Sequence, residues 1–407
     1  MSERTMPTTP KEWIRENIFL GKTIGEYIKS LITPWNIVAA AILAVGIPVI
    51  IYRLIYGLGA ATHLSNINPW GLWLGFDMFF GVAVATGGFV MAVGVYIFGL
   101  KDYQPMVRPA ILTGFLGYFF AIVGLAMDLG RYYRLPYPLT FSMGTASVLF
   151  LVAEHLALYL TIQFIEFLPA VVEWLHLTKI REWLYKIHIG AVILGSVLVL
   201  GHQSALGAVF LIMPSRLHPL WYSPYLPYLF FVSCLAGGIA MLVVESLLSH
   251  KVFGWQVKES DHEKIDRLTL GLGKAAGFVL FAYFALKMLA LLHGGNWVYL
   301  KGFYGVVYLI EVIGFVLLPL YLYTMAVRRQ SATLVRVASV LTVLGIMVNR
   351  FNVCMTALNW DAPERYFPSW MEIVLSLTLA TFGVIVFKWV VNRMPVLYRL
   401  PDFPDEH

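Results

Sequence analysis

Long apolar runs recur along the whole chain, each about as long as the hydrocarbon core of a bilayer is thick. Such a core measures roughly 30 Å, and an α-helix needs about 20 apolar residues to cross it. Ten runs of this kind follow one another, at residues 34–58, 71–99, 109–130, 140–168, 187–213, 225–249, 268–292, 302–327, 333–355 and 369–392. The strands of an outer-membrane barrel would instead show alternating segments of roughly ten residues. We therefore predict an all-α, polytopic membrane bundle of about ten transmembrane helices.

The composition supports a membrane protein and limits its metal chemistry. Charged residues make up 13% of the 407 positions, whereas a soluble chain averages roughly 25% and uses those charges to cover its surface. The two cysteines, Cys234 and Cys354, lie far apart inside apolar runs. The spacings typical of iron–sulfur clusters, zinc sites and c-type haem attachment are missing. We expect no metal centre held by cysteine in this chain.

The distribution of positive charge predicts the orientation. Only 8 of the 29 lysines and arginines fall on the side that faces away from the termini, namely Arg53, Arg131, Arg134, Arg216, Lys287, Lys301, Arg350 and Arg365. Because cytoplasmic loops carry the excess of positive charge, we expect both termini in the cytoplasm and the chain in the inner membrane.

Three regions follow from this orientation. Residues 34–395 form the transmembrane domain, and residues 396–407 form a cytoplasmic tail. Residues 1–33 place apolar side chains at roughly helical spacing among Lys and Glu, which predicts an amphipathic helix lying on the cytoplasmic membrane surface; a solvated tail is the alternative. This segment lacks the uninterrupted apolar core of a cleavable signal.

A weak internal repeat is visible in the second and sixth runs. Gly87-Gly88-Phe89-Val90-Met91 in the second resembles Gly237-Gly238-Ile239-Ala240-Met241 in the sixth. The two runs lie four helices apart and cross in the same direction, so spans 2–5 and 6–9 read as two four-helix bundles. The alternative is that the glycine pairs only mark close packing, which is common between membrane helices.

Ionisable residues inside the apolar runs are functional candidates, because placing a charge at the centre of a bilayer costs several kcal/mol. A dense group is expected near the outer surface: Asp77, Asp128, Arg131, His202, Gln203 and Arg350. Deeper in the membrane lie Glu154, His155 and Glu311, and toward the cytoplasm Glu166, His188 and Glu245. Buried groups of this kind exchange protons, and we place Glu166, His188, Glu245 and Glu311 on a proton path.

Two structural alternatives remain open for these residues. Asp128 and Arg131 stand one helical turn apart, where they would pair with each other. The remaining groups would serve only as interhelical hydrogen bonds. A haem-binding role is a further alternative, with one haem held between His155 and His202. The fourteen-residue spacing of His188 and His202 suits two stacked haems, but no second helix carries the matching pair.

A series of motifs in fixed order resembles a known family. The series begins with Asn68-Pro69-Trp70-Gly71-Leu72-Trp73-Leu74-Gly75-Phe76-Asp77 and continues with Pro105-Met106-Val107-Arg108-Pro109-Ala110, Asp128-Leu129-Gly130-Arg131-Tyr132, His202-Gln203-Ser204-Ala205-Leu206-Gly207, His218-Pro219-Leu220-Trp221, Glu245-Ser246, Ile310-Glu311-Val312 and Tyr366-Phe367-Pro368-Ser369-Trp370-Met371-Glu372. Covering about residues 35–395, it resembles the NrfD/polysulfide-reductase family of quinone-interacting membrane subunits, and most closely its hydrogenase-2 (HybB-like) branch.

The resemblance implies a membrane subunit with no haem or iron–sulfur cluster of its own. Such a subunit binds menaquinone or ubiquinone near the outer face and meets a periplasmic ferredoxin-like iron–sulfur subunit there. The electrons would pass to or from a catalytic subunit of the nickel–iron hydrogenase, molybdopterin or multihaem type. No nucleic-acid partner is expected.

The resemblance also suggests roles for individual residues. Asp77, His202 and Gln203 would contact the quinone head group, with Glu154 and His155 lining the deeper part of the site. Asp128, Arg131 and Arg350 would orient these groups and balance their charges. One departure affects this transfer: related sequences often carry Glu at the position of Leu151, and here the acid appears one turn later, as Glu154.

An ion or solute transporter is the alternative from another functional class. Parallel repeats and buried acids would serve a transporter as well as a quinone site. Transporters often show helices broken at mid-membrane in paired positions, and this sequence lacks such breaks.

Overall fold

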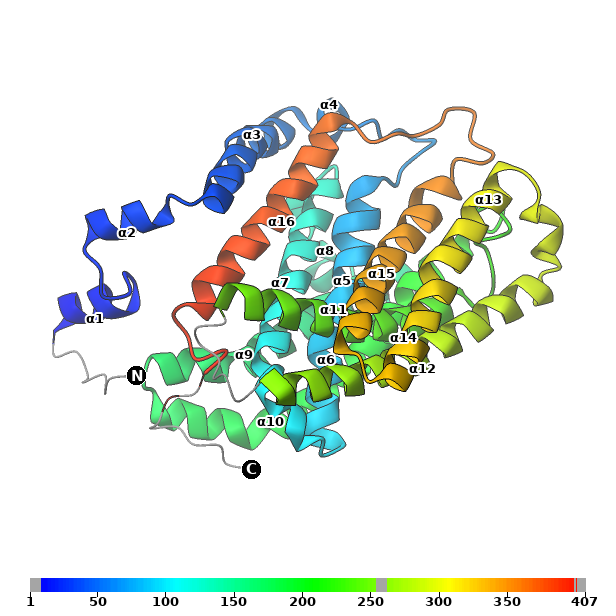
Figure 1. The fold of residues 1–407 in the computed structure, drawn as a ribbon. Helices are drawn as coiled ribbons and strands as arrows, with labels where there is room; N and C mark the ends of the chain where they lie inside the picture. The colour runs from blue at the N-terminus through cyan, green and yellow to red at the C-terminus, as the bar shows by residue number, and fades with distance from the viewer. Residues whose placement is uncertain (1–8, 254–261, 399, 401–407) are drawn as a thin grey trace.

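The computed structural model describes residues 9–253, 262–398 and 400, and in these residues the chain is helical with no strand. Ten helical segments are long and apolar enough to cross a membrane (Figure 1). The predicted all-α membrane bundle is thereby confirmed, and the chain is a multi-pass membrane protein.

Several of the spans are assembled from more than one helical segment. Spans 1 to 5 are α3 (Pro34–Tyr56); η1 (Trp73–Phe80), α5 (Gly81–Ala85), α6 (Gly87–Ala92) and η2 (Val93–Ile97); η3 (Lys101–Tyr103) and α7 (Gln104–Asp128); α9 (Val148–Trp174); α10 (Thr178–Val209) and η5 (Phe210–Ile212). Spans 6 to 10 are α11 (Leu226–Phe253); α12 (His262–His293); α13 (Phe303–Leu309), η9 (Ile310–Leu317) and α14 (Leu318–Arg329); α15 (Ala332–Phe351) and η10 (Asn352–Thr356); α16 (Trp370–Val391).

Span 4 shows the largest shift from its predicted limits. It was predicted at 140–168 and is found at Val148–Trp174. The polar turn before it ends at Ser147, whose extended backbone precedes the helix. At the other end, the helix continues past Glu173, whose side chain is buried and paired with Arg108 and Arg181 rather than facing lipid.

The spans pack as two groups of four with two flanking helices. The second to fifth spans contact one another in a ring, and the sixth to ninth spans do the same. The flanking helix α16 packs on α3 and α7. The arrangement agrees with the two four-helix bundles expected from the repeat.

The two glycine pairs of the repeat meet at the boundary between the bundles. A Cβ atom on Gly87 would lie 2.9 Å from the carbonyl oxygen of Gly238, and one on Gly238 would lie 2.7 Å from the backbone nitrogen of Gly87. The backbones of α6 and α11 therefore touch at this crossing, and only glycine permits the approach.

The two ends of the chain lie on one side of the bundle. Arg393, just after α16, donates to the carbonyl oxygen of Ile18 at 2.7 Å and to the Tyr27 hydroxyl at 2.7 Å. We call this side the terminal face. The other side, here the distal face, carries the connections 57–72, 129–147, 213–225, 294–302 and 357–369, which include α4 (Leu58–Ala61), η4 (Tyr132–Arg134), α8 (Tyr137–Thr140) and η8 (Asn296–Leu300).

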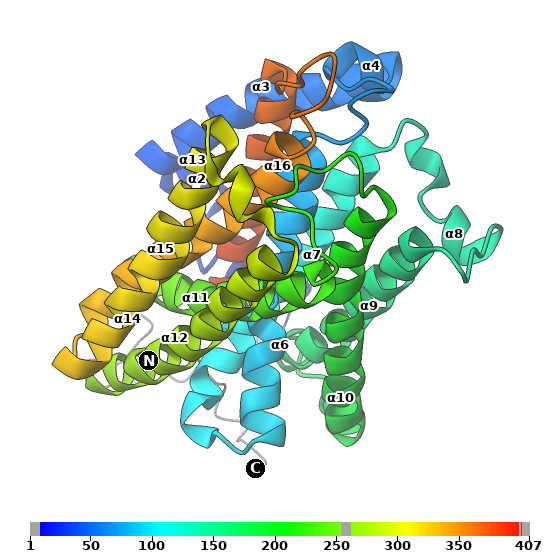
Figure 2. The same cartoon turned by 90° about the vertical axis from the view of Figure 1, so that its right-hand side faces the viewer.

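The segments outside the bundle differ in how they attach. Figure 2 shows α8 projecting sideways from the bundle beside the start of α9. The N-terminal helices α1 (Pro10–Asn17) and α2 (Ile24–Leu31) each begin with a capping box. Their position on the cytoplasmic membrane surface stays a prediction, and the predicted tail, 396–407, falls largely outside the described residues.

The contact between the two bundles generates the first testable prediction. Gly238→Ala forces the α6 and α11 backbones apart, and overpacking of this kind costs about 1–3 kcal/mol. We expect a lower midpoint of thermal unfolding in detergent, measured by fluorescence-detected size-exclusion chromatography. The matched control is Gly190→Ala, because a Cβ atom there meets no atom within 4 Å. Equal thermal midpoints for the Gly238→Ala and Gly190→Ala variants would contradict the close contact between the α6 and α11 backbones.

Candidate functional site

Among the described residues, three buried polar clusters and a polar cavity between the spans are candidates for the functional site. These side chains are buried in an apolar bundle, where each polar atom needs a hydrogen-bond partner from the protein. An atom that has such a partner is held in place, and an atom without one can bind a ligand. Two of the clusters include a segment of π-helix: η1 carries Asp77, and η9 and η10 carry Glu311 and Asn352. Such segments are rare and are frequent at functional sites.

The first group is the carboxyl cluster, formed by Asp77, Asp128 and Glu372, with the guanidinium of Arg53 near Asp128. Asp77 accepts a hydrogen bond from the Ser376 hydroxyl at 2.7 Å. Its side chain fills space left by Gly124 on α7, where a Cβ atom would lie 2.5 Å from that of Asp77. The cluster thus joins spans 1, 2, 3 and 10.

Arg53 supplies the positive charge of the carboxyl cluster. It is fully buried and donates to the carbonyl oxygens of Met127 and Leu129, at 2.8 and 2.5 Å, at the end of α7 beside Asp128. The expected neighbour, Arg131, lies exposed beyond the helix end, and the described residues include no ion pair between it and Asp128. One Asp128 oxygen, Oδ1, is buried without a partner among the described residues.

Glu372 and Tyr366 close this cluster toward the distal face. The Glu372 carboxylate accepts from the backbone N–H groups of His63 and Ser369, both at 3.0 Å, and from the Tyr366 hydroxyl. Burial, together with the neighbouring Glu372, raises the pKa of Tyr366 well above its usual value. The phenol therefore stays protonated and remains a donor to the carboxylate.

The second group is the histidine cluster, formed by Tyr118, His202 and Gln203. The Gln203 amide Nε2 donates to the carbonyl oxygen of Val82 at 3.2 Å and to the Tyr118 hydroxyl at 3.3 Å. Nδ1 of His202 lies 3.5 Å from the same hydroxyl. His202 and Gln203 are fully buried, yet His202 Nε2 and Gln203 Oε1 have no partner among the described residues.

His155 and Glu154 stand beside the histidine cluster on α9. His155 Nδ1 donates to the carbonyl oxygen of Leu151 at 2.8 Å, and its Nε2 edge packs on Gly201, where a Cβ atom would lie 2.6 Å away. Both residues are half-buried. Four of the five predicted quinone residues therefore gather on α9 and α10, and the fifth, Asp77, lies in the carboxyl cluster instead.

The third group, the lysine–glutamate cluster, lies in the second bundle. Glu311 forms a buried ion pair with Lys287. It also accepts from the Asn349 amide at 2.9 Å, the Asn352 amide at 2.7 Å and the Trp221 indole at 2.9 Å. Both carboxylate oxygens are thus occupied, and Glu311 is held as a fixed anion.

Arg350 adjoins this cluster and leaves it with an excess of positive charge. The guanidinium donates to Asn349 Oδ1 at 2.6 Å and to the Ser233 hydroxyl at 2.9 Å, and it stacks 3.8 Å from the centre of the Phe230 ring. These are neutral partners, so Lys287 and Arg350 share the single negative charge of Glu311. A cavity of about 30 Å³ borders Lys287 and Asn349, which is room for a water molecule.

A polar cavity of about 40 Å³ lies in the first bundle toward the terminal face. Glu166, His188, Tyr96 and Arg108 are among its lining residues. His188 Nε2 is buried with no partner in the described part of the chain. The cavity has room for at least one water molecule, and its polar lining would hold it.

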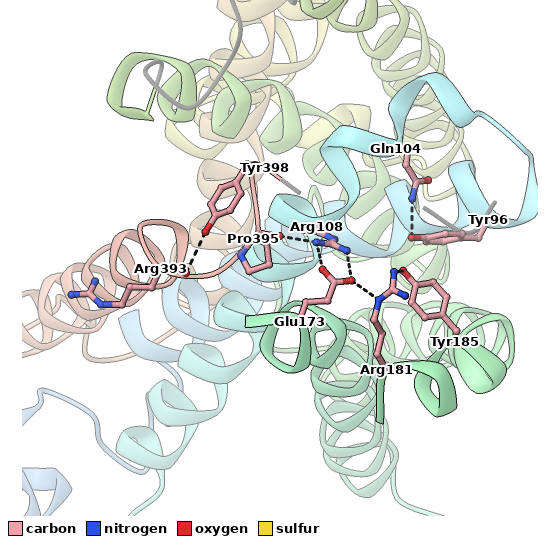
Figure 3. A network of polar contacts seen from close by, with 9 residues as sticks. All are labelled: Tyr96, Gln104, Arg108, Glu173, Arg181, Tyr185, Arg393, Pro395 and Tyr398. Atoms are coloured by element: carbon pink, nitrogen blue, oxygen red, sulfur yellow. Dashed lines mark hydrogen bonds and ion pairs between the residues drawn. The ribbon is translucent and has the colours of Figure 1, made fainter. Parts of the chain in front are cut away.

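Ion pairs stand at the terminal end of this cavity. Figure 3 shows Glu173 between Arg108 and Arg181, with Arg108 2.8 Å and Arg181 2.9 Å from the carboxylate. Arg108 also donates to the carbonyl oxygen of Pro395 at 2.8 Å. The remaining predicted path residue, Glu245, lies apart from the cavity on α11, where it faces Thr113 of α7.

Comparison with known proteins now places the chain. A family model described as "Polysulphide reductase, NrfD" matches residues 60–360, about three quarters of the sequence. The chain belongs to this family. The resemblance inferred from the sequence motifs is thereby confirmed.

Three relatives align with the chain over most of its length. A protein of Nitratidesulfovibrio vulgaris whose name gives no function is 48% identical over 93% of this chain and 98% of its own. The probable Ni/Fe-hydrogenase 2 b-type cytochrome subunit of Escherichia coli is 28% identical over 86% and 88%. The menaquinone reductase integral membrane subunit of Nitratidesulfovibrio vulgaris is 24% identical over 87% and 88%. The two relatives whose names state a function are thus membrane subunits of redox complexes.

The name of the hydrogenase relative raises the question whether a b-type haem fits this chain. The candidate ligands are His155 and His202, which face each other across α9 and α10. The edge of His155 packs directly on the α10 backbone at Gly201, one residue before His202, and His155 Nδ1 is engaged by Leu151. This packing leaves no space for a porphyrin between the two imidazoles, so the residues do not fit the group.

Spectroscopy tests this packing argument. We expect the purified chain, reduced with dithionite, to show no haem α-band in its visible spectrum and no pyridine haemochrome after extraction. An α-band of one haem per chain that disappears in His202→Ala would contradict the argument.

A double-mutant comparison tests the lysine–glutamate cluster. Lys287→Met leaves Glu311 as a buried charge without its cation, which costs about 3–5 kcal/mol. Lys287→Met/Glu311→Gln removes both charges, and we expect its thermal midpoint in detergent to lie above that of the single variant.

The exposed ion pair of Arg336 with Asp266 at 2.5 Å provides the matched control. Arg336→Met should cost less than about 1 kcal/mol, because exposed pairs contribute little. A Lys287→Met variant as stable as the wild type would show that Glu311 does not depend on its partner.

Proposed function

We propose that the chain is the quinone-reactive membrane subunit of a respiratory redox complex. It would exchange electrons between the quinone pool and an iron–sulfur protein docked on the distal face, with a catalytic subunit such as a nickel–iron hydrogenase beyond it. Membership of the NrfD family supports this role, as do the names of the hydrogenase and menaquinone reductase relatives.

The observation that carries the proposal is the pair of unpartnered atoms in the histidine cluster. Burying a polar atom without a partner costs roughly 1–3 kcal/mol, and the successive residues His202 and Gln203 each have one such atom. His202 Nε2 would donate to a quinone carbonyl oxygen, and Gln203 Oε1 would accept from the O–H of the reduced form. We assign the head group to His202 and Gln203, with Glu154 and His155 lining the approach from the lipid.

The carboxyl cluster is the second position for a head group. The unpartnered Asp128 Oδ1 supports it, and an apolar group that includes Val49, Trp73, Leu375 and Leu379 offers a lining for an isoprenoid tail. Asp128 lies near Asp77, Glu372 and the buried guanidinium of Arg53, so the carboxyl groups of this cluster can hold and release protons. In this arrangement Asp77 would face a carbonyl oxygen of the quinone, with Asp128 beside it. Arg53 would balance the negative charge of these carboxylates, the role that the sequence analysis gave to Arg131.

The proton path proposed from the sequence divides into two parts. Glu166 and His188 share the terminal-side cavity, which suits proton exchange. Glu311 is engaged by four donors, so we propose that it and Arg350 set the electrostatic potential of the second bundle. Glu245 stays a candidate path residue on α11.

The proposed orientation places the terminal face in the cytoplasm and the distal face in the periplasm of an inner membrane. The distal connections and the first residues of α13 and α16 expose large aromatic side chains, including Phe141, Trp297, Phe303, Phe367 and Trp370. Aromatic residues are enriched at membrane interfaces and at protein contacts, which supports this face as the docking side for the iron–sulfur partner.

Variants of the two clusters test the function and locate the head group. In the complex isolated from native membranes, His202→Ala should lower quinone-dependent turnover about 100-fold or more, because proton transfer and hydrogen bonding to the head group are lost. Activity with an artificial dye should stay within twofold of the wild type, since the dye takes electrons from the partner subunits. Asp77→Asn should have the same effect if the head group meets the carboxyl cluster.

An exposed residue at the terminal face, away from the proposed docking side, provides a control. Asp102→Asn removes a carboxylate outside both clusters and should leave both activities unchanged. Wild-type quinone turnover in both His202→Ala and Asp77→Asn would refute the quinone assignment.

A further inference from the structure

The lysine–glutamate cluster occupies the place in the second bundle that the histidine cluster occupies in the first. In the repeat, spans 3, 4 and 5 correspond to spans 7, 8 and 9. The histidine cluster and its neighbours on α9 come from the first three, whereas the charged members of the lysine–glutamate cluster and Arg350 come from the last three. Each group also bonds to the glycine-pair span of its bundle: Gln203 donates to the carbonyl oxygen of Val82, and Arg350 donates to the hydroxyl of Ser233. The two groups are therefore equivalent positions in the repeat.

The two positions differ in what they leave unmatched. In the histidine cluster two polar atoms lack partners, whereas in the second bundle the charges themselves do not balance. Lys287 pairs with Glu311, but the partners of the fully buried Arg350 are an amide oxygen, a hydroxyl and a phenyl ring. Its Nε is buried without a partner, and the described residues include no ion pair between Arg350 and a carboxylate. One net positive charge is left inside the bundle.

This charge cannot be removed by loss of a proton from Arg350, because arginine stays protonated in proteins. An unbalanced charge is strongly unfavourable inside a membrane bundle, where water does not solvate it. A negative ion bound next to Lys287 and Arg350 would restore neutrality. The electrostatics of the cluster therefore favour an anion that the chain does not itself supply.

The cavity of about 30 Å³ beside Lys287 offers a place for such an ion. Lys287 stands in its wall with Tyr283 and Tyr308, and none of its lining residues is a carboxylate. The Lys287 ammonium lies 5.0 Å from the centre of the Tyr308 ring and 5.6 Å from that of Tyr283. It has three N–H groups and uses one of them on Glu311, so it retains donors for a ligand in the cavity.

The size of the cavity limits the ligand. The space suits one particle of about the size of a water molecule. A chloride ion is only slightly larger than water, whereas a quinone ring or an organic acid is several times larger. The equivalent position in the second bundle is thus too small for a quinone head group and suits a small ion.

The cavity wall also shows how Arg350 takes part and from which side the ion arrives. Phe230 and Asn349 line the cavity, and both contact Arg350 on their other side. Arg350 therefore acts through its charge, and Lys287 makes the direct contact. Ser223 and Asn296, from two of the distal connections, complete the wall, so the cavity borders the distal face.

We propose that the cavity beside Lys287 is a binding site for one small monovalent anion of the chloride type, held by the Lys287 ammonium and balanced by the charge of Arg350. The inference concerns the second bundle and goes beyond the proposed quinone function, on which it does not depend. The bound ion completes the neutralisation of a buried cluster that ties spans 7, 8 and 9 together.

Replacement of the anion at constant ionic strength tests the site in the wild-type complex. Sodium gluconate is exchanged stepwise for sodium chloride in detergent, and the thermal midpoint of this chain is followed by fluorescence-detected size-exclusion chromatography. We expect a saturable rise of about 3 °C or more, because a ligand that binds only the folded state stabilises it. Bromide should replace chloride, whereas gluconate is too large for the cavity. Equilibrium dialysis with radiolabelled chloride should show saturable binding that bromide displaces.

Two variants break the same ion pair and change the net charge in opposite directions. Lys287→Met removes the direct ligand and the excess charge, so both the chloride-dependent rise and one bound chloride per chain should be lost. Glu311→Gln leaves two net positive charges, and the half-saturating chloride concentration should fall about tenfold. The matched control is Lys274→Met, which removes an exposed lysine of the same helix and should respond to chloride as the wild type does.

The wild-type measurement alone can overturn the inference, even where a variant does not fold. Equal midpoints in chloride and gluconate, with no saturable binding of labelled chloride, would show that the cluster remains without an anion. A chloride response that persists unchanged in Lys287→Met would place the ion elsewhere in the complex and overturn the assignment. Weaker chloride binding in Glu311→Gln than in the wild type would also contradict the charge argument.

Discussion

A polar side chain inside a lipid-embedded bundle must find its partner in the protein, and this constraint governs the structure. Lipid tails offer no hydrogen bonds, so an unmatched group is costly. Arg53 meets the constraint with backbone carbonyl oxygens, and Glu311 meets it with an ion pair and three hydrogen bonds. The constraint is unmet at several atoms of the described residues, and two of these, His202 Nε2 and Gln203 Oε1, are where we propose that the quinone head group binds.

The sequence predicted the architecture well because the bilayer imposes a simple length rule. Ten spans, their order and the glycine repeat follow from apolar runs and small residues. The limits of span 4 were wrong by about two turns at each end, and at its C-terminal end the reason is that hydropathy cannot show that Glu173 is buried inside the protein. The predicted members of the candidate site are largely buried, yet their grouping differs: Asp77 and His202 belong to separate clusters.

The sequence alone did not show which residues pair with the buried charged side chains. Arg53 comes from the first span to meet Asp128, a contact across 75 positions that no local spacing encodes. Lys287 was counted only as a distal charge, although it neutralises Glu311 of the next span. Tyr118 lies in an apolar run, and an uncharged polar residue gives a weak signal in a hydropathy profile. Its contacts with Gln203 and His202 appear only when the helices are packed.

The bond from Arg393 to Ile18 and Tyr27 has a consequence for how the protein is made. The N-terminal helices leave the ribosome first, whereas Arg393 emerges only after the tenth span has been synthesised. The first helices can meet span 4 earlier, because Trp13 of α1 packs on Trp174 of α9, but the hydrogen bonds to Arg393 form only after the tenth span is in place. Those bonds are therefore a late event that marks a completed chain.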